Sequence, residues 1–413
     1  MSVGGSGIPR LQDLSYIEVA IRHITAGATF EQIRRGLVTR AKDLDRQNDI
    51  DGSFAEERWE RTQADATKHV HNTVDVLKEL MRLGWLERHI LPSTPASAYL
   101  HADATFILTD SGRAWAELVT TDQRGAYNQL VGVLAAAHPQ FRGFLKLVGA
   151  TPESTSTHFT VPLLKPTASA HPTNAAILDS FVDYTAKALD TGTLGWSADH
   201  ATVEHGIRTY VQKFETRMHA RKKDVTRKQF VNTCEEAVTR AAFAAGGCPT
   251  DYISMELLRR WTRLLGIANF SYYAPGPHAL RLWATAEVQT NGTAVTINRR
   301  VGPQVRSEAL RALWAVWRDI LEDSSTVTYA PIWKVRAAVC WRQRINDDEF
   351  DRAISEALGH QHPELPFDIH LDQASLRATP ASTRPLVLPT STGVRRVFNV
   401  INLVPASLNK ETT

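Results

Sequence analysis

Hydrophobic residues recur at helical spacing between residues 66 and 83, and two short apolar runs follow on either side of a polar stretch. The inward stripe predicted for this helix consists of Val70, Val74, Leu77, Leu80 and Met81. Gly84 is expected to end the helix, because glycine tolerates positive φ. The runs at 85–90 and 106–108 predict two strands joined by a polar hairpin tip at 92–98, and residues 109–112 predict the start of another helix.

Two further helices are predicted before this stretch. One covers residues 11–24, where apolar positions repeat every three or four residues, and Gly27 interrupts the pattern. Thr29 and Gln32 fit a capping box, so a second helix is expected to begin there. Residues 54–63 are charged and predict a short third helix. These elements together define a first domain at 11–120.

The order of elements in this domain resembles the second half of a winged helix-turn-helix domain. The residues that carry the resemblance are LKELMRLGWLE at 77–87 and FILTDSGRAWAEL at 106–118, which are similar to bacterial members of that superfamily. The resemblance covers about a quarter of the chain and implies DNA binding as the first expectation. Winged helices also mediate protein contacts, so the fold alone does not decide the function.

The middle of the chain predicts a helical domain at 121–212. Two helices separated by His138-Pro139 are expected at 123–149, and two more at 174–189 and 199–218. The segment 151–173 is rich in Ser, Thr and Pro and predicts a connector with one strand.

Helix pairs followed by short strands then recur twice. Residues 213–300 contain predicted helices at 230–245 and 251–265, the latter ended by Gly266, and returning strands at 280–288 and 295–297. Residues 301–404 contain predicted helices at 307–321, 332–341 and 347–358, with strands at 367–371, 385–388 and 397–404. The expected fold is therefore mainly α with small β-hairpins, of the α+β class, with tandem winged-helix modules around a helical middle domain.

Composition narrows the function classes only slightly. The chain has 413 residues, 43% of them hydrophobic and 22% charged, which is typical of a multidomain globular protein. A net charge of +3 permits a nucleic-acid partner without requiring one. Cys234, Cys248 and Cys340 are widely spaced, which indicates a reducing, cytoplasmic compartment. No apolar run has the length of a membrane span and the N-terminus lacks a signal-peptide pattern, so neither a membrane nor export is expected.

The first predicted DNA contact is the outer side of the helix at 66–83. A helix in the major groove reads base edges, and the hairpin beside it reaches the backbone. Lys68 and Arg82 are expected to neutralise phosphates, and Asn72 to pair with an adenine edge. The outward residues predicted on the helix are Lys68, His71, Asn72, Asp75, Lys78, Glu79 and Arg82, and those in the hairpin are Arg88, His89, Ser93, Thr94 and His101. The alternative is an ordinary solvated face, with Asp75 and Glu79 repelling phosphate.

Two more basic groups are candidate phosphate contacts. Arg259, Arg260 and Arg263 are expected to project from the helix at 251–265, with Arg281 on the returning strand. The buried stripe predicted for that helix consists of Ile253, Leu257, Leu258, Trp261, Leu264 and Leu265. The densest positive run lies at 213–228 and contains Arg217, Arg221, Lys222, Lys223, Arg227 and Lys228. It suits phosphate tracking, or it is a solvated helix end or linker.

Catalytic motifs are weak. No glycine-rich phosphate loop follows a predicted strand. His200, Glu204 and His205 lack metalloprotease order, and the dense segment HQHPELPFDIHLD at 360–372 has no lysine after its acids. No cofactor or metal is therefore expected, and the tryptophans are expected to pack in cores.

The favoured hypothesis is a non-catalytic protein that binds double-stranded DNA. By analogy it belongs to a bacterial defence, restriction-type or regulatory complex with further protein partners. Two alternatives stay open. One is a kleisin-like structural partner of a chromosome-organising ATPase, and the other is a metal-dependent nuclease that uses residues 360–372.

Overall fold

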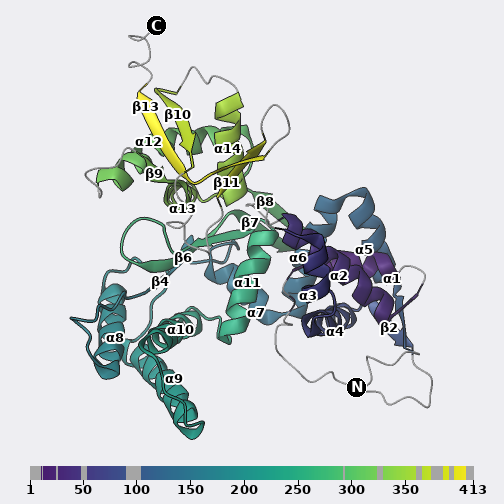
Figure 1. Ribbon diagram of the computed structural model, residues 1–413, viewed down its shortest axis with the longest axis horizontal. Helices are drawn as coiled ribbons and strands as arrows, with labels where there is room; N and C mark the ends of the chain where they lie inside the picture. Colours follow the sequence, from purple (N-terminus) through teal and green to yellow (C-terminus); the bar gives the residue numbers. More distant parts are fainter. Residues whose placement is uncertain are drawn as a thin grey trace. The chain divides into compact units, whose positions relative to one another are not determined.

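The computed structural model describes residues 11, 13–24, 27–47, 54–89, 104–291, 294–322, 329–359, 365–373, 385–389 and 395–405 (Figure 1). These residues are mainly helical with small antiparallel sheets, which confirms the expected secondary-structure class. Within these ranges, no helix combines the length and the apolar character that crossing a membrane requires.

The residues of the chain gather into two compact units. Unit 1 contains residues 1–144, 250–265 and 289–297, and unit 2 contains residues 145–249, 266–288 and 298–413. The chain thus returns twice to unit 1 from unit 2. The segment 213–300 is divided between the two units, and the four-domain division expected from the sequence stays a prediction.

Unit 1 begins with amphipathic helices around a small sheet. Its elements are α1 Ser15–Ile24, β1 Ala28–Thr29, α2 Phe30–Gln47, α3 Glu56–Gln63, α4 Thr67–Arg82, β2 Leu86–His89, β3 Thr105–Leu108, α5 Asp110–Thr121, α6 Gln123–Ala137 and, from the later segment, α11 Tyr252–Leu264. Helix α1 packs on α2, and α4 packs on both. Helix α7 Pro139–Leu147 follows α6 and crosses the boundary between the units.

The helix ends of unit 1 follow from local chemistry. Gln32 Oε1 accepts from the Thr29 backbone N–H at 2.8 Å, and Thr29 Oγ1 accepts from that of Gln32 at 3.4 Å, which confirms the capping box. Gly84 has φ +72° directly after α4, as expected. Thr109 Oγ1 donates to Gly84 O at 2.7 Å and accepts from the Gly112 N–H at 3.2 Å, so one side chain ties the end of α4 to the start of α5.

Tryptophans anchor the core of unit 1. Trp85 and Trp115 stack with ring centroids 4.9 Å apart, and Trp115 Nε1 donates to Ala126 O at 3.0 Å. Trp261 of α11 is fully buried and its Nε1 donates to Leu11 O at 2.8 Å. The indole N–H therefore finds a partner inside the core in both cases, which is what a buried tryptophan requires.

Unit 2 contains two further three-stranded sheets. Its first part consists of β4 His158–Pro162, α8 Asn174–Asp190, α9 His200–Ala220, α10 Arg227–Ala245, β5 Ala268–Ser271 and β6 Ala279–Ala284. Its second part consists of α12 Pro303–Glu322, β9 Ala330–Pro331, α13 Ile332–Gln343, α14 Asp347–Gly359, β10 Phe367–Asp372, β11 Leu386–Pro389, β12 Arg395–Phe398 and β13 Val400–Pro405. The hairpin of β7 Ala286–Asn291 and β8 Ala294–Arg299 contributes residues to both units.

The three-stranded sheets share one strand order. They run β1-β3-β2, β4-β6-β5 and β10-β13-β9, and all pairings are antiparallel. In each sheet the strand that comes last in the sequence lies in the middle. The sequence predicted a threefold recurrence of helices and strands, but it placed β4 in the helical middle domain rather than in a sheet with β5 and β6.

The two faces of the β4-β6-β5 sheet differ. Phe159, Val161, Leu280 and Leu282 are all buried, and Phe159 packs edge-on against Phe243 of α10 at 5.3 Å. Side chains alternate along a strand, so Thr160 and Arg281 belong to the opposite face. At the end of β6, Trp283 joins the core of α12, α13 and α14, and its Nε1 donates to Ile345 O at 3.1 Å.

Candidate nucleic-acid interface

Helix α4 carries a polar outer side, as expected. Lys68, His71 and Lys78 are exposed, while Asn72 and Asp75 are half-buried. Lys68 Nζ donates to Gln63 Oε1 at 2.7 Å. Because the Gln63 amide is neutral, this hydrogen bond does not compensate the charge of Lys68. Lys68, His71 and Lys78 therefore lie on the exposed side of α4.

The inner side of α4 differs from the predicted stripe. The buried apolar residues are Val76, Leu77 and Leu80, whereas Val70, Val74 and Met81 are only half-buried. His69 is buried instead, because it lies 6.2 Å from the Trp59 ring of α3 and its Nε2 bonds to Gln63 O at 2.9 Å. The short helix α3 covers α4 on a side that periodicity alone did not predict as buried.

Glu79 was predicted on the outer side of α4, and this prediction is wrong. The residue is 1% exposed, and its Oε1 lies 2.5 Å from Nε2 of the equally buried His138. The other ring nitrogen, Nδ1, lies 3.1 Å from Nη1 of Arg82. Arginine can only donate, so Nδ1 accepts and Nε2 carries the hydrogen that Glu79 accepts. The outer side therefore lacks one of the two carboxylates that were expected to repel phosphate.

The hairpin after α4 contributes less than expected. Arg88 is half-buried and lies on the same side of β2 as the buried Leu86, while Glu87 and His89 are exposed on the other side. His89 Nε2 lies 3.9 Å from Glu87 Oε2. Ser93, Thr94 and His101 lie outside the described residues.

Four of the six residues predicted for the buried stripe of α11 are buried, namely Leu257, Leu258, Trp261 and Leu265. Arg259 is 2% exposed and pairs with Glu256 one turn earlier, so its side chain does not project from the helix as predicted. Ile253 and Leu264, predicted in the core, are 46% and 54% exposed. Met255 and Thr262, which were not in the predicted stripe, are buried as well. Arg260 is exposed and Arg263 is half-buried. Arg281 is also buried, which removes it from any surface that could meet a duplex.

The basic run at 213–228 covers the end of α9, the turn after it and the start of α10, so it is a helix end rather than a linker. Helices α9 and α10 pack along each other (Figure 1), and Lys222, with φ 52°, lies in the turn between them. Thr226 and Gln229 form a capping box that starts α10. That Thr-x-x-Gln spacing is a sequence signal that would have located the turn.

The cations of this turn point into solvent. Arg227 is the exception, because its guanidinium donates to His171 O at 2.7 Å and Thr167 O at 2.9 Å and so holds the connector before α8. The exposed cations, which we call the hairpin tip, are Lys213, Arg217, Arg221, Lys222, Lys223 and Lys228. The ion pairs of the described part of the chain include none of these six.

The weaker catalytic candidates are dispersed. His200 Nε2 lies 3.2 Å from Asp190 Oδ1, and Glu204 binds Arg208 at 2.7 Å. Residues 360–364 lie outside the described residues, and Asp368, His370 and Asp372 occupy alternate, exposed positions of β10. Across the described ranges, no three His, Cys, Asp or Glu side chains converge as metal ligands would.

Comparison with family models, with curated proteins and with solved structures finds no match to this chain.

Proposed function

We propose that this protein binds double-stranded DNA through electrostatic contacts, and that residues 15–121 form a winged helix that takes part in the binding. The element order helix, strand, helices, strand, strand, together with the β1-β3-β2 sheet, supports the fold assignment. The outer side of α4 supports the DNA contact. Because Glu79 is buried, the predicted outer charges that remain are one acid, Asp75, and three cations, Lys68, Lys78 and Arg82.

The hairpin tip is the observation that carries the proposal. Residues 213–228 contain seven lysines and arginines against two acids, and six of the cations are exposed on the end of α9, the following turn and the start of α10. Such a group neutralises phosphates and releases counterions, which favours binding to any sequence. In this proposal the tip supplies affinity, and α4 supplies base contacts through Asn72. The defence-type assembly and the protein partners expected from the sequence stay predictions.

A salt-titrated binding assay tests the proposal. Each phosphate contact contributes roughly 0.9 to the slope of log K against log salt, so replacing Arg221, Lys222 and Lys223 with glutamine should lower that slope by about 2.7. Affinity for a labelled duplex at about 0.1 M salt should fall by at least roughly tenfold, whatever the sequence. The readout is fluorescence anisotropy at several salt concentrations, without divalent ions.

The matched control removes the same charge elsewhere. Arg22, Arg35 and Arg46 are exposed but pair with Glu18, Glu31 and Glu56. Their triple glutamine variant should bind DNA like the wild type. Equal losses in both variants, or no duplex binding by the wild type at low salt, would refute the proposal and favour the protein-bridging alternative.

A further inference from the structure

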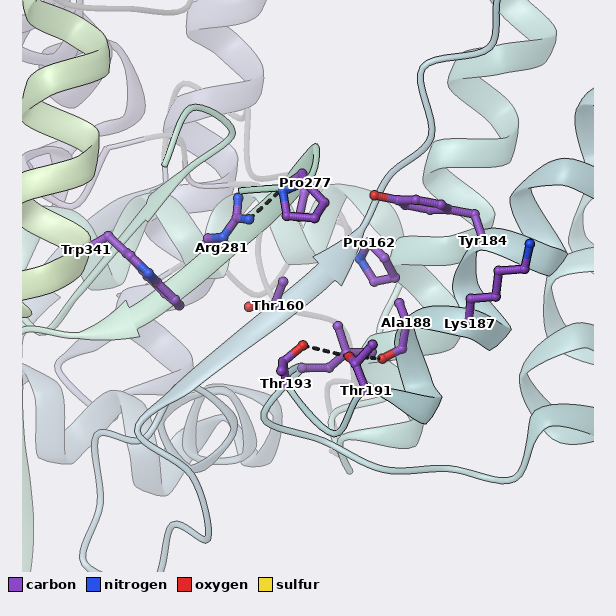
Figure 2. Close-up of a pocket in the computed structure, with 12 residues that line it drawn as sticks. Thr160, Pro162, Tyr184, Lys187, Ala188, Thr191, Thr193, Pro277, Arg281 and Trp341 are labelled. Carbon is purple, nitrogen blue, oxygen red and sulfur yellow. Dashed lines mark hydrogen bonds between the residues drawn. The ribbon is translucent and has the colours of Figure 1, made fainter. Parts of the chain in front are cut away.

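A cavity of about 400 Å³ lies in unit 2, beside the β4-β6-β5 sheet (Figure 2). Its walls come from β4 and β6, the C-terminal part of α8, the segment 191–194 and Trp341 of α13. Figure 2 shows Arg281 and Trp341 on one side, Tyr184 and Lys187 of α8 on the other, and Thr160 between them. The volume is within the range of small-molecule sites in proteins.

The strand register places the polar groups of this cavity. Thr160 of β4 and Arg281 of β6 are directly opposite each other, and Pro162 is opposite Ala279. Paired residues share a face of an antiparallel sheet, so these four side chains belong to the face opposite the helix-packed one. The hydroxyls of Thr191 and Thr193 lie 2.8 Å apart, and that of Thr191 donates to Ala188 O at 2.7 Å. The loop after α8 is thereby closed on itself and forms a defined wall.

Arg281 is a buried cation whose known partners are all neutral. It is 6% exposed, and its guanidinium donates to Ala274 O at 3.2 Å and to Pro277 O at 2.9 Å. The ion pairs found among the described residues include no carboxylate for it. The Trp341 ring lies 5.9 Å from its Cζ. Burial of a guanidinium without a counter-ion is costly, and the burial lowers the pKa of Arg281.

Further cations surround the same tryptophan and β6. Arg344 also lies over the Trp341 ring, with its Cζ 3.9 Å from the ring centroid, and its buried Nη1 has no hydrogen-bond partner. Nearby, burial together with Lys165 and Arg281 lowers the pKa of His278 to about 4. The guanidiniums of Arg281 and Arg344 therefore give the region around Trp341 a positive potential.

We propose that this cavity binds a small organic anion with an apolar body. Arg281 and Lys187 contact the anionic group from opposite sides, and the hydroxyls of Thr160 and Tyr184 are available as donors. Trp341, Pro162 and Leu194 pack against the apolar body. The inference is independent of DNA binding, because it concerns different residues from those of the hairpin tip and α4.

Matched probe pairs test the proposal by titration calorimetry on the full chain. The anionic probes are phenyl phosphate and benzoate, the neutral ones are phenol and benzyl alcohol, and inorganic phosphate tests the need for an apolar body. We expect at least one anionic probe to bind with a Kd below about 1 mM, and its neutral partner and inorganic phosphate to bind at least about tenfold more weakly. The two anionic probes also distinguish a phosphate ester from a carboxylate ligand.

Two variants locate the site. Arg281→Gln and Lys187→Gln should each weaken the anionic probe by at least about tenfold. Lys187 is exposed, so its variant should fold even where Arg281→Gln does not. Lys334→Gln, which changes an exposed lysine of α13 outside the cavity, should bind like the wild type. Absence of millimolar binding, equal binding of the neutral probes, or full affinity in Lys187→Gln would overturn the proposal.

Discussion

The contact between Glu79 and His138 joins α4 to the junction of α6 and α7 within unit 1. Its carboxylate and imidazole are both buried, and Oε2 of Glu79 has no partner. Replacing either Glu79 or His138 leaves the other residue without its hydrogen-bond partner in an apolar site, where an unpaired polar group is unfavourable.

We therefore expect Glu79→Ala to reduce the free energy of unfolding by about 3 kcal/mol, measured by urea denaturation. Glu79→Gln should lose less, because its amide oxygen can still accept from His138. The control is Glu87→Ala, an exposed residue of β2, whose effect should stay within about 0.5 kcal/mol. Similar effects at both glutamates would contradict the role given to the buried contact.

Gly112 has no room for a side chain. A Cβ atom there would lie 2.2 Å from Trp85 O, because the first turn of α5 passes close to the backbone after α4. Gly112→Ala should destabilise the protein by about 2 kcal/mol. Gly359→Ala, in open space at the end of α14, should change stability by less than about 1 kcal/mol in either direction. Thermal unfolding of both variants checks the difference, and equal midpoints would contradict it.

His278 predicts a pH dependence. Its pKa in the folded protein, about 4, is below its ordinary value of 6.5, so the unfolded chain binds more protons between these values. The contribution of neutral His278 is thus fully present above pH 6.5 and is lost as the pH falls towards 4. His278→Gln should lose less stability than the wild type between pH 7 and pH 5, as measured by urea unfolding. If the stability difference between His278→Gln and the wild type were the same at pH 7 and pH 5, His278 would titrate normally.

At the scale of elements, local signals predicted the ends of helices better than their orientation. The Thr29 capping box, Gly84 and Gly266 all act where the sequence placed them, because capping depends on residues within one turn. The centre of the buried side of α11 was predicted correctly but its edges were not, because Ile253 and Leu264 are exposed whereas Met255 and Thr262 are buried. The partners of its central Trp261, Leu11 and Phe141, lie more than a hundred residues away in the sequence, so periodicity alone could not fix these edges.

For the candidate DNA surface, too, features set by the local sequence were predicted and features set by distant residues were not. The outer residues of α4 were predictable because the core side of an amphipathic helix fixes the opposite side. The burial of Glu79 was not, because its partner His138 is distant in the sequence. The hairpin tip was recognised as a charged run, but its exposure on a fixed turn depends on α9 packing along α10.

If α4 contacts DNA, its two outer lysines should contribute to the salt dependence. Lys68→Gln with Lys78→Gln should lower the slope of log K against log salt by about 1.8, and Asn72→Ala should reduce sequence discrimination by about 1–3 kcal/mol. The control pair Arg22→Gln and Arg35→Gln, paired with acids on α1 and α2, should leave both unchanged. A variant of α4 with wild-type slope and wild-type discrimination would remove this helix from the interface.

At the scale of the whole molecule, the sequence did not predict that the units interleave. A linear reading joins α10 and α11 into one module because they are adjacent in the chain. Trp261 instead belongs to the core of unit 1 and Trp283 to that of unit 2, although only 21 residues separate the two indoles along the chain. Domain boundaries set by such long-range packing leave no local mark in composition or spacing.

The two fully buried tryptophans give a matched test of the division. Trp261→Ala should speed hydrogen exchange in α1, α6 and α11 while leaving α12 and α13 near their wild-type rates, and Trp283→Ala should do the reverse. Each substitution should lower the free energy of unfolding of its own unit by about 3–5 kcal/mol. Mass spectrometry of peptides from both variants provides the measurement. Uniform acceleration through the chain in either variant would mean that the units unfold as one.

The shared strand order has a consequence during synthesis on the ribosome. The central strand of each sheet is translated last, so the two outer strands have no strand to pair with until it emerges from the ribosome. The core of unit 1 is completed later still, because Trp261 is encoded more than a hundred codons after residue 144. At roughly 5–20 residues per second, its nascent helices spend on the order of ten seconds without α11. The newborn polypeptide therefore exposes the apolar docking site of that helix throughout this interval, where chaperones that bind nascent chains would find it.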